Sequence, residues 1–154
     1  MSIEMPLWTP SAERIAAAPL TAFATKAEKR AGRSLSGYAE LHAWSIAERE
    51  AFWDLVWDFC GVIGQKGGRV LADGDRMPGA RFFPEARLNF AENLLRGSGS
   101  GEAIVFRGED KVFRRMSWDE LHSLVSKLQQ LFVSLGVQKG DRIAAMMPNM
   151  PETV

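Results

Sequence analysis

The clearest pattern of apolar and polar positions lies near the C-terminal end of the chain. Apolar residues recur there at steps of three and four, as on one face of an α-helix; they are Leu121, Leu124, Val125, Leu128, Leu131, Phe132 and Leu135. Ser117 and Glu120 have the spacing of a capping box at a helix start, and Gly136 stands where a left-handed C-terminal cap is expected. The pattern therefore predicts a helix over 117–135.

A buried strand is expected directly after this helix. Residues 143–147 form an apolar run without alternation, behind the polar turn 139–142, and such a run is typical of a strand covered on both faces. Pro148 ends the run. Pro151 and Glu152 then have the composition of the first turn of another helix, where the missing N–H of proline costs little.

A β-hairpin is expected before the helix. Residues 103–107 and 111–115 are the expected strands, and Gly108, Glu109 and Asp110 form a three-residue, glycine-containing loop between them. Hairpin, helix and buried strand in this order make the first unit of an open α/β sheet, with the helix as the crossover. This unit is not self-sufficient, because the apolar helix face and the strand both need further neighbours.

The first part of the chain predicts short helices over 11–18, 21–31 and 36–43. A fourth helix is expected from Ser45 and Glu48, which again have capping-box spacing, to Gly61. Phe52, Leu55, Val56 and Phe59 mark one face of this helix and Trp53 and Trp57 a neighbouring face, so most of its surface should be packed.

The region after this helix is irregular. Glycine, proline and charged residues over 61–84 indicate an extended loop, and 88–96 a short helix closed by Gly97. The segment 97–101, Gly-Ser-Gly-Ser-Gly, has the composition of a flexible joint. The expected fold is thus α/β and incomplete: a helical and irregular N-terminal extension over 1–96, a linker over 97–101, and the start of a truncated larger domain over 102–154.

Composition excludes some classes of partner. Lys plus Arg and Asp plus Glu number 19 each and are scattered, so neither nucleic acid nor an anionic membrane is an expected partner. The first residues lack a basic start followed by an apolar core, so no signal peptide or membrane span is expected, and the cytoplasm is the expected location. Cys60 is the single cysteine; it allows no internal disulfide and is expected to be a buried structural thiol.

Candidate catalytic motifs are weak. The glycine segment 97–101 follows a helix and precedes a strand, which is the wrong context for a phosphate-binding loop, and the segment 64–67 (GQKG) suits an ordinary turn. His42 and His122 have no second metal ligand at suitable spacing, and His122 is expected at a surface or boundary. No nucleophile elbow occurs. The sequence therefore predicts no catalytic, cofactor-binding or metal-binding residue in this chain.

Several stretches resemble one family, the acetoacetate–CoA ligases, within the superfamily of acyl-adenylate-forming enzymes. Residues 7–11 (LWTPS) and 38–53 (YAELHAWSIAEREAFW) are similar to landmarks of that family. The most specific stretch is 77–96, MPGARFFPEARLNFAENLLR, which departs from the family pattern at Phe82, Glu85 and Phe90. Glu85 replaces a glycine, which puts the turn after Pro84 in question.

Later stretches resemble the start of the large N-terminal domain of acyl-CoA synthetases in general. They are Arg107-Gly108, residues 116–118 (MSW), 135–137 (LGV), 139–142 (KGDR) and 148–152 (PNMPE). These stretches indicate the superfamily, and the preference for acetoacetate rests on the earlier landmarks.

The resemblance implies a two-step reaction in the complete enzyme. The carboxylate of acetoacetate attacks ATP, which binds with magnesium, to form an acyl-adenylate and pyrophosphate, and the thiol of CoA then displaces AMP. The residues responsible in the family lie on motifs that do not occur in residues 1–154, so no functional residue is transferred. The expectation is an N-terminal fragment that is inactive alone and whose partner is the rest of the ligase chain. Two alternatives stay open: a non-catalytic interaction module derived from a ligase, and a fragment of an acetyl- or propionyl-CoA synthetase.

Overall fold

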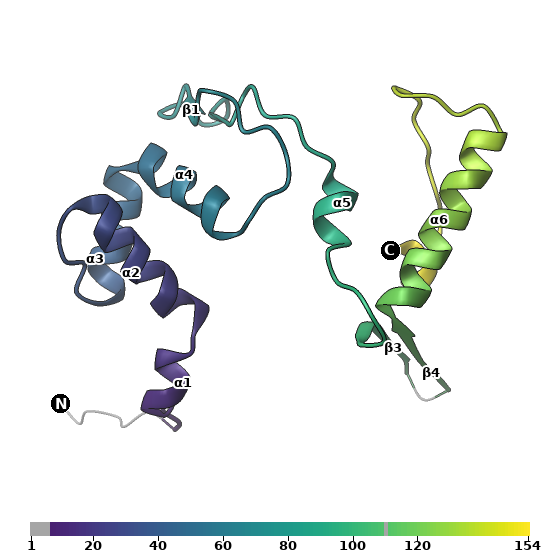
Figure 1. The fold of residues 1–154 in the computed structure, drawn as a ribbon, viewed down its shortest axis with the longest axis horizontal. Helices are drawn as coiled ribbons and strands as arrows, with labels where there is room; N and C mark the ends of the chain where they lie inside the picture. The colour runs from purple at the N-terminus through teal and green to yellow at the C-terminus, as the bar shows by residue number, and fades with distance from the viewer. Residues whose placement is uncertain (1–6, 110) are drawn as a thin grey trace. The chain divides into compact units, whose positions relative to one another are not determined.

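The computed structural model describes residues 7–109 and 111–154 and divides into two compact units, with the boundary between Asn89 and Phe90 (Figure 1). Each unit is described by itself.

The first unit is built on four helices: α1 (Ala12–Ala16), α2 (Pro19–Ala31), α3 (Gly37–Ala47) and α4 (Arg49–Phe59). The hydroxyl oxygen of Ser11 caps α1 by accepting a hydrogen bond from the Arg14 N–H, and Pro19 occupies the first turn of α2. Gly32 and Gly61 end α2 and α4 with positive φ angles of 66° and 59°. The helices predicted over 11–18, 21–31 and 36–43 are confirmed, although α3 continues to Ala47.

The predicted capping box at Ser45 and Glu48 is wrong. Ser45 lies within α3, and its hydroxyl donates a 2.8 Å hydrogen bond to the His42 carbonyl. Glu48 alone separates α3 from α4, with the non-helical angles φ −116° and ψ 57°, and no side chain caps α4. The S-x-x-E spacing occurs at the C-terminal end of α3 rather than at the start of a helix. Helix α3 continues through Ser45 because Leu41 and Trp44 are packed in the core.

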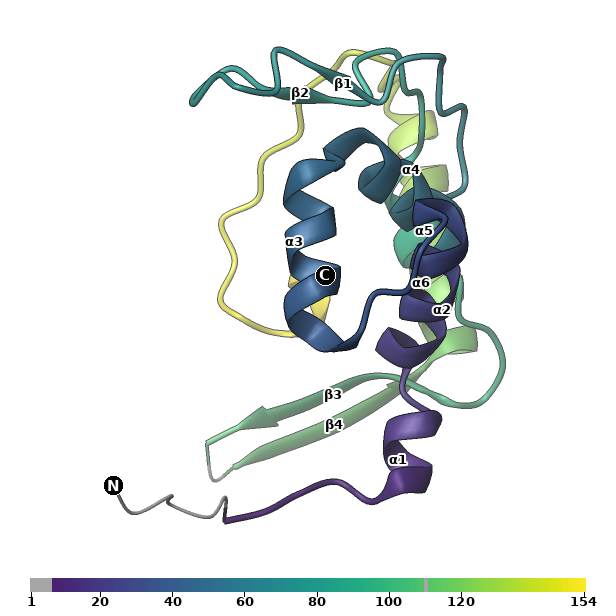
Figure 2. The same ribbon diagram turned by 90° about the vertical axis from the view of Figure 1, so that its left-hand side faces the viewer.

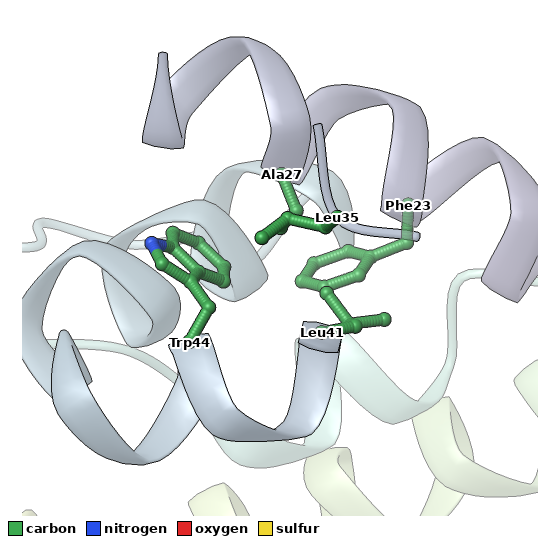
Figure 3. Packing of buried hydrophobic residues seen from close by; sticks show 5 residues of the cluster. All are labelled: Phe23, Ala27, Leu35, Leu41 and Trp44. Atoms are coloured by element: carbon green, nitrogen blue, oxygen red, sulfur yellow. The ribbon is translucent and has the colours of Figure 1, made fainter. Parts of the chain in front are cut away.

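The core of the first unit lies between α2 and α3. Its buried side chains are Phe23, Ala27, Leu35, Leu41 and Trp44, and Figure 3 shows them gathered between the two helices. Phe23 also meets Phe52 and Phe59 of α4 edge to face, with ring centroids 5.7 and 5.2 Å apart. Aromatic pairs in this geometry add to the stabilisation from burial. Three helices therefore share one aromatic cluster.

The two tryptophans of α4 pack against the loop that follows, which confirms the prediction of a helix with most of its surface covered. The Trp53 ring lies 5.2 Å from that of Phe82, and the Trp57 ring lies 4.9 Å from that of Phe83. Trp57 is buried, whereas Trp53 stays partly exposed. These contacts hold the irregular segment against the helical cluster.

The segment predicted as an extended loop over 61–84 contains a little sheet structure. Strands β1 (Leu71–Ala72) and β2 (Arg81–Phe82) pair antiparallel, and Gln65 forms an isolated bridge with Arg87 (Figure 2). Strands of two residues are too short to show an alternation of apolar and polar residues. The glycines and prolines around them therefore led to the prediction of a loop.

Glu85, the departure from the family pattern, is accommodated by a specific contact. Its carboxylate accepts a 2.9 Å hydrogen bond from the Gly68 N–H. A Cβ atom at Gly67, where φ is +80°, would lie only 2.6 Å from the Glu85 Cβ. The close approach of Glu85 therefore requires glycine at position 67.

The second unit comprises α5 (Phe90–Leu94), the hairpin of β3 (Glu102–Gly108) and β4 (Val112–Ser117), α6 (Trp118–Ser134) and the short 3₁₀ helix η1 (Pro151–Thr153). The predicted hairpin is confirmed: Val105 pairs with Arg115, and Gly108 pairs with Val112. Asp110, part of the predicted loop, lies outside the described residues. Helix α5 is shorter than the predicted 88–96.

Helix α6 has the predicted ends. The Ser117 hydroxyl accepts a hydrogen bond from the Glu120 N–H at 3.2 Å, and the Glu120 carboxylate accepts one from the Ser117 N–H at 2.8 Å. Both halves of the capping box are therefore present. Gly136 follows the helix with a φ of 76°. The capping box thus forms the start of the helix and the left-handed Gly136 follows its end, as the sequence indicated.

The strand predicted over 143–147 is not formed. These residues run as an extended, irregular segment, and all five side chains are exposed. The sheet formed by β3 and β4 has two strands, neither of which pairs with this segment. An apolar run becomes a strand only when neighbouring strands satisfy its backbone groups, and the described residues do not supply them.

Replacement of Trp44 by alanine tests the core of the first unit. Trp44 is 1% exposed, so we expect Trp44→Ala to lower the free energy of unfolding by about 3–5 kcal/mol. Ile46→Ala on the same helix is the matched control, because Ile46 is 59% exposed and its loss should cost less than about 0.5 kcal/mol. Denaturant unfolding followed by far-UV circular dichroism measures both, and equal effects would contradict the assignment of this core.

Candidate functional site

The apolar face of α6 is largely exposed in the second unit. Of the seven apolar residues predicted to share this face, Leu121 is buried. Four others remain between 47% and 69% exposed: Leu124, Leu128, Leu131 and Leu135. An exposed apolar face of this kind is typical of a helix that packs against another element.

The face of α6 borders a groove of about 300 Å³ in the second unit, here called the α5–α6 groove. It is lined by Ala91, Leu94, Leu95, Ala103, Ile104, Trp118, Leu121, Val125, Leu128 and Val154. Every lining side chain is apolar or aromatic, so the groove suits an apolar occupant and offers no ionic group for catalysis.

The hairpin adds a second incomplete surface. Strands β3 and β4 pair with each other, and within the described residues neither outer edge has a further strand partner. Free edges expose a row of backbone N–H and C=O groups that can pair with another strand. Helix face and hairpin are therefore both arranged to receive additional structure.

The C-terminal residues fold back onto this unit. The Glu152 carboxylate forms an ion pair with the Arg114 guanidinium of β4 at 2.7 Å, and this contact holds the pKa of Glu152 below its usual value. The Thr153 hydroxyl donates a 2.6 Å hydrogen bond to the Pro148 carbonyl. These contacts position Val154 at the α5–α6 groove.

The glycine segment 97–101 is bonded to the first turn of α6. The N–H groups of Trp118 and Asp119 donate to the carbonyls of Gly101 and Gly99 at 3.1 and 3.2 Å, and the Gly99 N–H donates to the Asp119 carboxylate at 3.1 Å. A Cβ at Gly97 would lie 2.1 Å from the Trp118 ring. The first N–H groups of the helix are therefore engaged internally rather than directed at a phosphate.

The other candidate residues from the sequence are separated. His122 is partly buried, and its Nε2 lies 3.0 Å from the Leu95 carbonyl oxygen, which confirms its boundary position. His42 stacks on Tyr38 with ring centroids 5.8 Å apart. Within the described part of the chain, no group of three His, Cys, Asp or Glu side chains could hold a metal ion.

The expectation that Cys60 is buried is wrong. Cys60 is exposed, because it is the residue that follows the last turn of α4 rather than a member of its packed faces. Apolar neighbours in the sequence do not predict the burial of Cys60, because the side-chain direction changes by about 100° with each residue of a helix.

The strongest charge cluster lies in the first unit. Asp54 of α4 forms ion pairs with Arg30 of α2 and, at 2.7 Å, with Lys66, which also contacts Asp58 at 2.6 Å. The hydrogen bond from Lys66 is the main cause that lowers the pKa of Asp54. Burial tends to lower the pKa of Lys66, but its bonds to Asp54 and Asp58 outweigh this and raise it. The cluster ties α2 and the segment after α4 to one carboxylate.

The lowered pKa of Asp54 makes the stability of the first unit depend on pH. Because the carboxyl pKa is lower in the folded than in the unfolded chain, its stabilisation is complete above the unfolded value of about 3.9 and is lost as the pH falls through the folded value. Lys66, with a raised pKa, loses its contribution only as the pH rises above about 10.4. At neutral pH the ionised Asp54 therefore stabilises the first unit, and this stabilisation is lost in acid.

Replacement of Asp54 by asparagine tests this linkage. We expect Asp54→Asn to lower the free energy of unfolding by about 1–2 kcal/mol at neutral pH, with the difference from the parent chain shrinking below about pH 4. Asp75→Asn is the control, because the Asp75 side chain is 94% exposed and should contribute little at any pH. Thermal unfolding across a pH series measures both, and a pH-independent loss for Asp54→Asn would contradict the linkage.

Comparison with known proteins agrees with these features. Residues 38–94 match the family described as "Acetyl-coenzyme A synthetase N-terminus". The chain is 57% identical over 154 residues to an acetoacetyl-coenzyme A synthetase of Rhizobium meliloti (strain 1021), a match that covers 100% of this chain and 24% of that protein. A malonamoyl-CoA synthetase of Penicillium aethiopicum is 36% identical over 151 residues, which cover 93% of this chain and 21% of that protein.

A solved structure also resembles the chain. The acetoacetyl-CoA synthetase from Streptomyces lividans matches with a TM-score of 0.81 and 39% sequence identity, over 97% of this chain and 24% of that one. The chain thus spans about a quarter of the length of the relatives it matches. In the described part of the chain, no helix combines the length and apolar character needed to cross a membrane.

These similarities extend over nearly the whole chain. The chain corresponds to the N-terminal portion of acetoacetyl-CoA synthetases, and residues 38–94 correspond to the N-terminal family described for acetyl-coenzyme A synthetases. The resemblance in the stretches 38–53 and 77–96 is thereby confirmed. Apart from Leu121, the leucines on the apolar face of α6 stay exposed among the described residues.

Alanine replacement of two leucines of α6, seven positions apart, tests how much of its apolar face is covered in this chain. Leu121 is 7% exposed, so Leu121→Ala should cost about 2–5 kcal/mol of unfolding free energy. Leu128 is 50% exposed, and we expect Leu128→Ala to cost less than about 1 kcal/mol in the 154-residue chain. Chemical denaturation of the two variants measures the difference, and equal losses would show that Leu128 is covered as well.

Proposed function

We propose that the chain is the N-terminal part of an acetoacetate–CoA ligase and is inactive by itself. The observation that carries the proposal is the 57% identity to an acetoacetyl-CoA synthetase over the whole chain, combined with coverage of only 24% of that protein. The exposed face of α6 and the unpaired edges of the hairpin support it, since both need structure from the rest of a larger domain.

The complete enzyme would join acetoacetate to CoA in two steps. The acid and ATP form acetoacetyl-adenylate and release pyrophosphate, and the CoA thiol then displaces AMP to give acetoacetyl-CoA. Magnesium accompanies the ATP, and the nucleotide-binding motifs of the family do not occur in residues 1–154. The first N–H groups of α6 are bonded within the chain. We therefore propose that ATP, magnesium and CoA bind to the remainder of the ligase.

The part played by this chain is structural in this proposal. The first unit forms an independent helical core around Trp44, and the second unit supplies the hairpin and the crossover helix on which an open α/β sheet is built. In the complete enzyme we expect residues 143–147 to become a strand of that sheet.

A second acid substrate is favoured by one observation. The matching family description names acetyl-coenzyme A synthetase, and an acetyl-coenzyme A synthetase of Streptomyces coelicolor is 33% identical over 141 residues. The higher identity to the acetoacetyl-CoA synthetase supports acetoacetate as the first candidate. Acetate and malonamate are therefore the competing acids that an assay should include.

Pyrophosphate release tests the proposal directly. We expect the purified 154-residue chain to release no pyrophosphate from ATP with acetoacetate, acetate or malonamate, because it holds none of the nucleotide-binding motifs of the family. The protein encoded by the reading frame continued past Val154 should release it, and fastest with acetoacetate.

Three results would contradict this account. Turnover by the 154-residue chain would show that it contains a catalytic site. A stop codon directly after Val154, with a monomeric product that unfolds cooperatively, would favour a free-standing interaction module. A longer protein that prefers acetate would identify an acetyl-CoA synthetase instead.

A further inference from the structure

Residues 65–87 of the first unit form one irregular antiparallel ribbon, which packs on α4. At its base, Gln65 and Arg87 exchange two backbone hydrogen bonds of 2.8 and 2.9 Å. At its other end β1 pairs with β2 (Figure 2), and residues 73–80 form the turn beyond this pairing, here called the tip. The two ends of the ribbon are attached to the helices in different ways.

The base of the ribbon is held by partly buried groups. The Lys66 ammonium forms ion pairs with Asp54 and Asp58 of α4, and the Lys66 side chain is only 24% exposed. The Phe83 ring packs on the ring of Trp57, which is buried. Dissolved salt screens partly buried charge pairs much less than exposed ones. The base should therefore stay attached to α4 over a wide range of ionic strength.

The tip is held by one exposed side chain. The Arg49 guanidinium donates a 2.6 Å hydrogen bond to the Gly74 carbonyl and forms a 2.6 Å ion pair with the Asp75 carboxylate, which is 94% exposed. In the described part of the chain, these are the polar contacts that join residues 73–80 to the helices, and none of these residues is buried. Segments with few buried contacts open locally at low cost in free energy.

The tip also adjoins a groove of about 710 Å³ between the helices and the ribbon. Arg30, Arg49 and Asp54 supply ionic groups to the helical wall of this groove, and Leu71 lies in its ribbon wall. A Cβ atom at Gly74 would lie 2.7 Å from the Leu71 side chain, so the tip and this wall are in close contact. Movement of the tip is therefore coupled to the width of the groove.

From these contacts we propose that the tip is a salt-sensitive flap, which Arg49 latches beside this groove. At low ionic strength the pair of Arg49 with Asp75 keeps the flap closed. At about 1 M salt, where the screening length is about 3 Å, the pair weakens and the flap opens, while the base remains attached. The open flap admits small ions to the ionic side chains of the groove. The inference goes beyond the proposed function and does not depend on it, because all these contacts lie within the first unit.

Limited trypsin digestion of the full-length protein tests the proposal. Cleavage after Arg76, in the tip, requires local opening and reports the population of the open flap when opening and closing are fast. We expect Arg49→Gln to raise the initial rate of this cleavage about tenfold at low salt. Salt at about 1 M should accelerate the cleavage in the parent protein but not in the variant. Mass spectrometry quantifies the product relative to cleavage after Arg33, an exposed residue between α2 and α3.

Two further variants keep the digestion interpretable. Asp75→Asn removes the charge pair but leaves the hydrogen bond from Arg49 to Gly74, so it should abolish the salt dependence with a smaller rise in rate. Arg81→Gln is the matched control, because Arg81 pairs at 3.2 Å with Asp73 inside the ribbon. It should change the rate by less than about twofold. Thermal unfolding shows whether each variant is folded.

The outcomes are distinct. Faster cleavage confined to the tip, with loss of the salt dependence in Arg49→Gln and Asp75→Asn, supports the latch. A parent protein whose cleavage does not respond to salt, or variants cleaved as slowly as the parent, would overturn it. Faster cleavage throughout the ribbon and α4 would also overturn it, since Arg49 would then stabilise the whole unit. A tip that resists trypsin under every condition would show that another part of the protein covers it, which equally contradicts a flap.

Discussion

The apolar face of α6 is the constraint on which the second unit depends. Burial of a large apolar side chain is worth about 1.5–3 kcal/mol, and this helix with its C-cap Leu135 carries seven such residues on one face. Leu121 alone among them is buried in the 154-residue chain. The helix nevertheless has well-formed ends, because Ser117 and Glu120 cap its start through local hydrogen bonds. Most of the apolar surface of α6 thus stays uncovered among the described residues.

The first unit differs, because it contains its own aromatic core. Phe23 and Trp44 are buried between α2 and α3, and Phe52 and Phe59 of α4 close the cluster. Asp54 adds a polar tie between α2 and the segment after α4. The first unit thus has an internal core, whereas the second unit has an open apolar face.

The sequence predicted those elements that depend on neighbours a few residues away. The hairpin of β3 and β4, the capping box of α6 and the left-handed Gly136 are of this kind, and all are present. Predictions that required distant contacts failed or were incomplete. Ser45 has the right spacing for a cap but lies within α3, and Cys60 has apolar neighbours but is exposed. The strands β1 and β2 were not predicted, because two residues are too few to show an alternation of apolar and polar positions.

The sequence by itself determined the family resemblance, the helices and the hairpin. Each of these depends on residues close together in the chain, namely the landmark stretches, the capping residues and the apolar positions at helical spacing. Only the tertiary structure decided which apolar residues are covered. Residues 143–147 read as a buried strand, yet they are exposed, since burial depends on strands that must come from elsewhere in a chain. Likewise, only the folded unit brings Val154, Leu94 and Leu128 to one groove, because these residues lie on separate segments that packing alone unites.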